Sequence, residues 1–454
     1  MNERMTYRAH ARGLLILGLP LVGSHLAQLA IGFTDSLMLG RYAVEALAAV
    51  TLGFSVQFVL FIVGSGFAFA VLPMVASAAA ENDEIAIRRV TRMGMWLSAI
   101  YGAVVMLPLI WAKPWLIALG QDPEVAALAA EYLRIFSFGM VPSLIVMVLK
   151  NYLAALERTQ IVLWATVATA VANAIGNYAL IFGNFGAPEL GIKGAAITSV
   201  VMQLLSLVIL VVYVNKTLPH HAMFQRFWRP DFDVLSRVMK LGWPIGLTNL
   251  AESALFSATA ILMGWIGALP LAAHGVALQL ASITFVVHLG LSQAATVRVG
   301  NALGRRDIQR LRDGALVAVV LSILFALVTV AIFLAIPEFL VGLYLDPTDP
   351  QRPEILRIGA ALLMVAALFQ LMDGAQVVAL SLLRGLQDTK MPMVIAAISY
   401  WGVGIPMCYI FGFIFEWGGV GVWLGLVVGL SCASGFLMHR FWALKLPKLE
   451  IARS

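Results

Sequence analysis

Three acidic residues of this 454-residue chain, Asp35, Glu252 and Asp373, stand well inside long apolar stretches. The other 21 acidic residues lie in polar segments or near the ends of apolar ones. A carboxylate in an apolar medium is costly, so it is retained chiefly where it binds a cation, carries a proton or joins neighbouring helices by hydrogen bonds. These three residues therefore predict cation or proton chemistry.

Glu252 and Asp373 are expected to form one site. Glu252 follows Lys240 by 12 residues and Asp373 precedes Arg384 by 11, which places both roughly 17 Å from the basic ends of their helices. Two acids at one level can share a proton or hold Na⁺. Residues on neighbouring turns are predicted to complete the site or to line a substrate cleft: Asn249, Phe256, Phe369, Gln370 and Gln376. For the two phenylalanines, ordinary helix packing is the alternative.

The first half of the chain carries a second constellation. Gln28 and Asp35 are expected on one face of a helix, and Asn173 and Asn177, four residues apart, share a face of another. Thr198 is expected near the same depth. One carboxylate and two amides predict a second cation or proton site, and a hydrogen-bond network between helices is the alternative.

The composition requires a membrane around these residues. Apolar residues make up 61% of the chain, charged residues make up 12%, and the mean hydropathy is +0.92. A water-soluble fold exposes too much of its surface to accommodate this composition. We therefore predict an all-α integral membrane protein with twelve spans, near residues 13–39, 46–75, 93–112, 129–155, 161–183, 191–214, 239–264, 271–303, 313–336, 354–384, 393–415 and 418–440.

The basic residues predict the topology. With twelve spans both termini share a side, and 22 Lys and Arg residues fall on that side against four on the other. This distribution predicts a multi-pass membrane protein with both termini in the cytoplasm. Lys150, near the end of its span, is expected to extend its side chain to the interface. The net charge of +6 is too modest to indicate a nucleic-acid partner.

The chain is predicted to consist of two similar halves. At an offset of 224 residues Gly18 matches Gly242 and Gly66 matches Gly290, and at an offset of 227 Gly191 matches Gly418. Six helices per copy is an even number, so the copies are parallel repeats and would face one another across a cleft. We place one lobe at 1–220 and the other at 221–454, joined by a basic cytoplasmic linker at 215–238.

Several segments resemble the multidrug and toxic-compound extrusion (MATE) family, and the likeness covers nearly the whole chain. They are PLVGSHLAQLAIGFTDSLMLG, FGNFGAPELGIKGAAITS, VRVGNALGRRD, LLRGLQDTK, SYWGVGIPMCYIFGF and GGVGVWLG. Glu252 and Asp373 resemble the carboxylate pair of the NorM-like branch. The chain departs from the pattern at Phe369, where a tyrosine is expected, and at Asn177, where another branch has an aspartate.

The resemblance implies an antiporter that exports cationic or amphipathic drugs in exchange for Na⁺ or H⁺. Glu252 and Asp373 would couple the cation in the second lobe, with Na⁺ as the candidate metal, and Asp35, Asn173 and Asn177 would form the site of the first. We expect no other cofactor, and we expect a monomer whose partners are small-molecule drugs, organic cations and the lipid bilayer. The choice between Na⁺ and H⁺ stays open.

Other functions are alternatives. A lipid-linked oligosaccharide flippase of the wider superfamily would carry more spans and a cationic cavity. An integral-membrane enzyme is disfavoured because no nucleophile motif such as GxSxG and no metal-ligand cluster stands in the spans. A channel is disfavoured because no filter motif occurs. We therefore expect a transporter and not an enzyme.

Overall fold

The chain folds into long α-helices with short connections. A computed structural model describes residues 5–451. Twelve helical segments within those residues are long and apolar enough to cross a membrane, which confirms the predicted number. Large apolar side chains on their outer surfaces include Phe33, Trp164 and Ile261, which are 70%, 62% and 58% exposed. The described residues contain no strand, in agreement with the all-α prediction.

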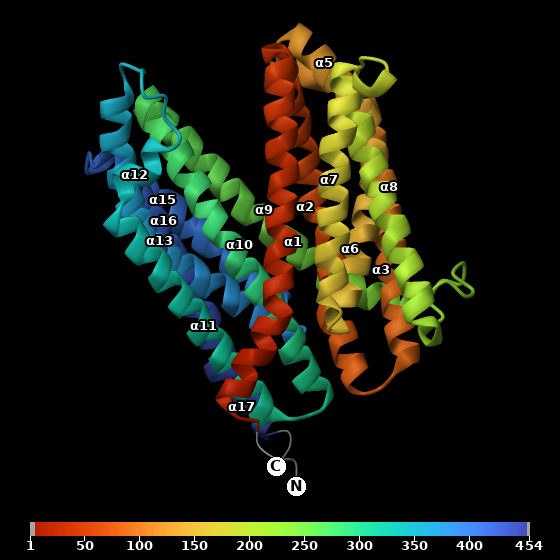
Figure 1. The fold of residues 1–454 in the computed structure, drawn as a ribbon. Helices are drawn as coiled ribbons and strands as arrows, with labels where there is room; N and C mark the ends of the chain where they lie inside the picture. Colours follow the sequence, from red (N-terminus) through yellow and green to blue (C-terminus); the bar gives the residue numbers. More distant parts are fainter. Residues whose placement is uncertain (1–4, 452–454) are drawn as a thin grey trace. The chain divides into compact units, whose positions relative to one another are not determined.

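The first half of the chain contains eight α-helices, some of which combine into one span. They are α1 (Tyr7–Tyr42), α2 (Val44–Ala80), α3 (Glu84–Ile110), α4 (Ala112–Ala118), α5 (Pro123–Phe136), α6 (Met140–Ala155), α7 (Thr159–Phe182) and α8 (Ile192–Thr217). Three 3₁₀ turns, η1 (Ser137–Gly139), η2 (Asn184–Gly186) and η3 (Pro219–His221), lie between them. Helices α2, α3 and α6 pack on one another, and α7 packs on α8 (Figure 1).

The second half repeats this order with more interrupted helices. It contains α9 (Phe232–Ile266), α10 (Ala268–Gly304), α11 (Ile308–Ala335), α12 (Pro337–Gly342), α13 (Arg352–Gly385), α14 (Lys390–Ala397), α15 (Ile405–Tyr409), α16 (Gly418–His439) and α17 (Leu446–Ile451). Three π-helical segments, η4 (Ile398–Gly404), η5 (Ile410–Ile414) and η6 (Arg440–Lys445), continue the last two spans. Helix α13 packs against α10, α11 and α16.

Two compact units divide the chain, and the division passes through helices. One unit is Gly23–Gly246, and the other combines the residues up to Val22 with those from Leu247 onward. Helices α1 and α9 therefore each give their first part to one unit and the remainder to the other. The lobe boundary expected at residues 220 and 221, inside the linker, stays a prediction.

One close helix crossing of the first unit is repeated in the second. A Cβ atom on Gly66 of α2 would lie 2.2 Å from the carbonyl oxygen of Gly242 on α9, so the two backbones are in direct contact. In the other unit, a Cβ atom on Gly290 of α10 would lie 2.7 Å from the backbone nitrogen of Val22 on α1. Gly66 and Gly290 are equivalent at the offset of 224, so the crossings are repeats of each other.

The helix starts show the same repeat. Asp83 accepts a hydrogen bond from Ala86 N at 2.9 Å before α3, and Asp307 accepts one from Arg310 N at 2.9 Å before α11. The preceding residues, Asn82 and Arg306, both have a positive φ, of 57° and 53°. These aspartates satisfy backbone donors at the first turn of each helix. The pseudo-symmetry that the spacing predicts is therefore present in the local backbone.

Candidate functional site

Glu252 on α9 and Asp373 on α13 lie close enough for their charges to interact, as the prediction of a single site requires. Asp373 is 2% exposed and Glu252 is half-buried. Two interacting carboxylates repel each other when both are ionised, and a cation or a shared proton relieves that repulsion. Helix α9 begins at Phe232, well before Lys240, so Lys240 does not mark the start of the helix.

Four oxygen atoms of this region are buried and have no hydrogen-bond donor among the described residues. They are Glu252 Oε1, Gln370 Oε1, Asp373 Oδ1 and Gln376 Oε1. An unsatisfied buried acceptor costs about 1–3 kcal/mol, and oxygen atoms of this kind are the ligands that hard cations prefer. Within residues 5–451 no three His, Cys, Asp or Glu side chains gather as a metal site. A bound Na⁺ would therefore depend on amide oxygen as well as on the two acids.

An arginine outside the predicted set of residues also lies at this site. Arg384 of α13 donates from Nη2 to Asn249 Oδ1 at 2.9 Å, and its positive charge acts on Glu252. Asn249 is therefore next to the acids, as predicted, and Arg384 is an addition. Arg384 lies 11 residues after Asp373, which is three helical turns, so the shared face was available as a signal.

Gln376 connects the acids to a tyrosine that was not predicted. Its amide group interacts with the Glu252 carboxylate, and its Nε2 donates to Tyr400 Oη. Both Gln376 and Tyr400 are fully buried. Tyr400 lies in the π-helical segment η4, where a helical period of 3.6 residues does not tell which face a side chain takes. The sequence therefore held no signal for Tyr400.

The remaining residues predicted around the acids serve partly as packing. Phe256 and Phe369 meet edge-to-face with ring centroids 6.0 Å apart, and Phe369 also packs on Trp423 at 5.4 Å. Phe369 is 2% exposed, which fits the packing alternative. Gln370 donates from Nε2 to the Ala281 carbonyl oxygen at 3.2 Å and so joins α13 to α10.

The predicted constellation of the first half is assembled in the unit Gly23–Gly246. Asn173 Nδ2 donates to Asp35 Oδ1 at 2.6 Å, and Asn177 Nδ2 donates to the same oxygen atom. Both asparagines are at most 1% exposed, and Asn177 Oδ1 has no described donor. This arrangement offers one carboxylate and one free amide oxygen to a cation, or a network that joins α1 to α7.

Two other residues predicted near Asp35 take different positions. Thr198 donates to the Gly194 carbonyl oxygen at 2.9 Å, and a Cβ atom on Gly176 would lie 2.8 Å from its methyl group, so Thr198 packs α8 against α7 beside Asn177. Gln28 is exposed on α1.

The prediction for Lys150 was wrong. Its Nζ donates to Thr166 Oγ1 at 2.9 Å, and the same hydroxyl lies 2.9 Å from Ser24 Oγ. The side chain therefore reaches α7 within the unit and does not extend to an interface. A residue's distance from the end of a helix does not reveal a hydroxyl group on the next helix, which is why the position of Lys150 was misread.

Comparison with known proteins gives a family match and many relatives. The MatE family model matches residues 20–179 and 244–410. A protein of Rhizobium meliloti described as "Probable multidrug resistance protein NorM" is 47% identical over 442 residues, which cover 97% of this chain and 94% of that protein. A protein of Agrobacterium fabrum with the same description is 44% identical over 447 residues, covering 98% and 96%.

Solved structures share the fold. A MATE in complex with MaL6 superposes with a TM-score of 0.87 at 20% identity and covers 97% of both chains. The eukaryotic MATE transporter AtDTX14 superposes with a TM-score of 0.86 at 18% identity and covers 98% of both. The helix order of this chain is therefore that of solved MATE structures.

Proposed function

Because the chain belongs to the MatE family of membrane transporters, we propose that it is a secondary active multidrug antiporter. It would export cationic or amphipathic compounds in exchange for Na⁺ or H⁺ by alternating access. The multidrug resistance descriptions of its relatives support export of drugs. We place it in the bacterial inner membrane, as its bacterial relatives suggest, with both termini in the cytoplasm, as the basic residues indicate.

The observation that carries the coupling proposal is the pair of interacting acids with unsatisfied oxygen atoms. Glu252 and Asp373 would hold Na⁺ together with Gln376, or would share one proton. For one gradient to drive the other, the coupling ion and the drug must favour different states of the protein or compete for one site. A cationic drug and a coupling cation both gain from negative charge at this pair, which provides the competition. Asp35 with Asn173 and Asn177 is proposed as a second site.

Ethidium efflux from proteoliposomes tests the proposal. With an inward Na⁺ gradient or an inward H⁺ gradient imposed separately, we expect one of them to accelerate efflux severalfold over liposomes without a gradient. Acceleration by Na⁺ would make the acid pair a sodium site, and acceleration by H⁺ would make it a proton carrier. If neither gradient accelerates efflux of ethidium or of another organic cation, the antiport proposal is wrong.

Arg384 is expected to weaken the binding of the coupling cation. Its positive charge acts on Glu252 from within the protein, where charge interactions are screened less than in water. Replacing Arg384 with glutamine removes the charge, so the half-saturating concentration of the coupling cation in the efflux assay should fall severalfold. Arg305→Gln, which removes an exposed arginine, is the matched control. An unchanged or higher half-saturating concentration would contradict this role.

A further inference from the structure

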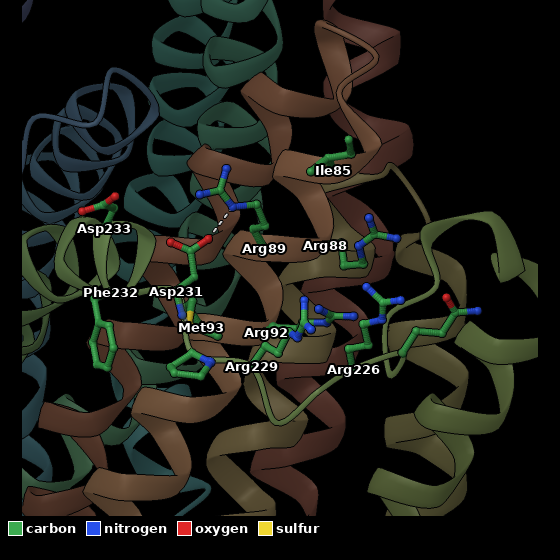
Figure 2. A pocket seen from close by; sticks show the side chains of 12 residues that line it. Ile85, Arg88, Arg89, Arg92, Met93, Arg226, Arg229, Asp231, Phe232 and Asp233 are labelled. Atoms are coloured by element: carbon green, nitrogen blue, oxygen red, sulfur yellow. Dashed lines mark hydrogen bonds and ion pairs between the residues drawn. The ribbon is translucent and has the colours of Figure 1, made fainter.

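A pocket of about 690 Å³ lies where α3 meets the linker between the two halves of the chain, inside the unit Gly23–Gly246. Five arginines line it: Arg88, Arg89 and Arg92 from α3, with Arg226 and Arg229 from the linker. Figure 2 shows the guanidinium groups of Arg92, Arg226 and Arg229 gathered on one side and Asp231 and Asp233 on the other. Five arginines against two aspartates leave three positive charges without compensation.

Among the described residues, one of these arginines, Arg89, has an ion-pair partner. Arg89 Nε donates to Asp231 Oδ2, and this hydrogen bond holds the pKa of the Asp231 carboxyl below its usual value. Asp231 is therefore an anion at neutral pH and remains paired. Arg88, Arg226 and Arg229 form no ion pair with any residue between 5 and 451.

The linker is held on α3 in a defined conformation. Arg92 donates from Nε to the Met223 carbonyl oxygen at 2.8 Å and from Nη2 to the Ala222 carbonyl oxygen at 3.3 Å. Trp96 Nε1 donates to the Phe227 carbonyl oxygen at 3.0 Å. These bonds fix the backbone that carries Arg226 and Arg229, so the cations are brought together despite their mutual repulsion. An arrangement of this kind is stabilised when an anion occupies it.

The equivalent positions at the helix start in the second half have one arginine in place of three. At the offset of 224, Arg88, Arg89 and Arg92 correspond to Arg312, Asp313 and Leu316. Arg312 lies 3.9 Å from the Glu450 carboxylate and so has a partner. The fold therefore does not need three arginines at the start of this helix, and the cluster is specific to the first half.

Two exposed aromatic residues lie beside the arginines. Trp228 is adjacent to Arg229, and Phe232 lines the pocket, and each is 72% exposed. Aromatic side chains next to cations are typical of the level at which lipid headgroups meet the acyl chains. Arginine is suited to phosphate because its planar donors bind two oxygen atoms at once. We infer that this pocket binds the phosphate group of an anionic phospholipid, with Arg88, Arg92, Arg226 and Arg229 as its donors.

Native mass spectrometry of the full chain in equal amounts of phosphatidylglycerol and phosphatidylcholine tests the inference. Wild-type protein should retain a phosphatidylglycerol molecule at collision energies that remove phosphatidylcholine. In the variant R88Q/R226Q, the ratio of retained phosphatidylglycerol to retained phosphatidylcholine should fall at least tenfold. The matched control R305Q/R306Q removes the same amount of charge from the turn before α11, where Arg306 has nearly the same φ as Arg226 (53° and 51°). This control should keep the preference for phosphatidylglycerol.

Two further measurements separate the sources of phosphate and guard against misfolding. Glycerol phosphate at the same concentration should not displace the lipid, and equal binding of this soluble compound would overturn the assignment to a lipid. Arg226→Gln alone changes one exposed linker residue and should reduce lipid retention while the protein still elutes as a single species. Equal lipid preference in wild type and R88Q/R226Q, or equal loss in both double variants, would also overturn the inference.

Discussion

Replacing Glu252 with glutamine is expected to reduce gradient-driven ethidium efflux to the rate of liposomes without protein. Glutamine has nearly the same shape but cannot ionise, so it neither binds Na⁺ as a carboxylate nor carries a proton. Asp373→Asn should have the same effect, because the charges of the two acids interact and the proposed coupling needs both. The measurement is the initial rate of ethidium efflux under whichever gradient drives the wild-type protein.

The matched controls are acids of the same types outside the site. Glu338→Gln in α12 and Asp349→Asn in the following loop change exposed residues and should leave efflux within about twofold of wild type. All four variants should be inserted in the membrane and elute as single species. Normal coupled efflux by either Glu252→Gln or Asp373→Asn would show that the acid pair is not the coupling site.

Replacing Gly66 with alanine is expected to destabilise the unit Gly23–Gly246 strongly. The added Cβ atom would lie 2.2 Å from the Gly242 carbonyl oxygen and 2.5 Å from the Gly246 nitrogen, and neither backbone atom can move without shifting α9. Overpacking in a close-packed interior costs about 1–3 kcal/mol and occasionally more. The check is the temperature at which half of the detergent-solubilised protein still elutes as a single species, which should fall by several degrees.

Gly435→Ala is the control for this change. It lies in α16, and a Cβ atom there would meet no atom within 4 Å. Alanine is the better helix former by about 1 kcal/mol, so the melting temperature of this variant should stay the same or rise slightly. Equal melting temperatures for Gly66→Ala and Gly435→Ala would show that α2 and α9 leave room for a methyl group at Gly66, which contradicts their close approach.

The number of spans, the repeat of the two halves and the positions of the acids within apolar stretches could be predicted, because each depends on a local property of the sequence. A span needs about 20 apolar residues, and an intramembrane acid such as Asp373 stands out against such a background. Asn173 and Asn177 were found because four residues bring two side chains to one face, and both donate to Asp35. The family motifs indicated the family, and the match of the MatE family model over residues 20–179 and 244–410 confirms that membership.

The features that the sequence did not predict depend on how far a side chain reaches and on irregularities within helices. Lys150 and Arg384 have long side chains, so their positions near helix ends did not show that Lys150 reaches Thr166 or that Arg384 reaches Asn249. Tyr400 lies in a π-helical segment that hydropathy does not reveal. The division of α1 and α9 between two units was also hidden, because a single apolar run can pack on different partners along its length.

That division has a consequence for the synthesis of the protein. The residues from Gly23 to Gly246 are one continuous stretch, and the start of α9 completes their packing on α2. The first turns of α1 pack instead on α10, at Gly290 and Leu291, which leave the ribosome much later. Since domains of a growing chain fold as units from the N-terminus, the start of α1 is synthesised long before the helix on which it packs. A nascent chain that stops after Gly246 would therefore contain the complete unit Gly23–Gly246, while the part of α1 up to Val22 would still lack α10, on which it packs.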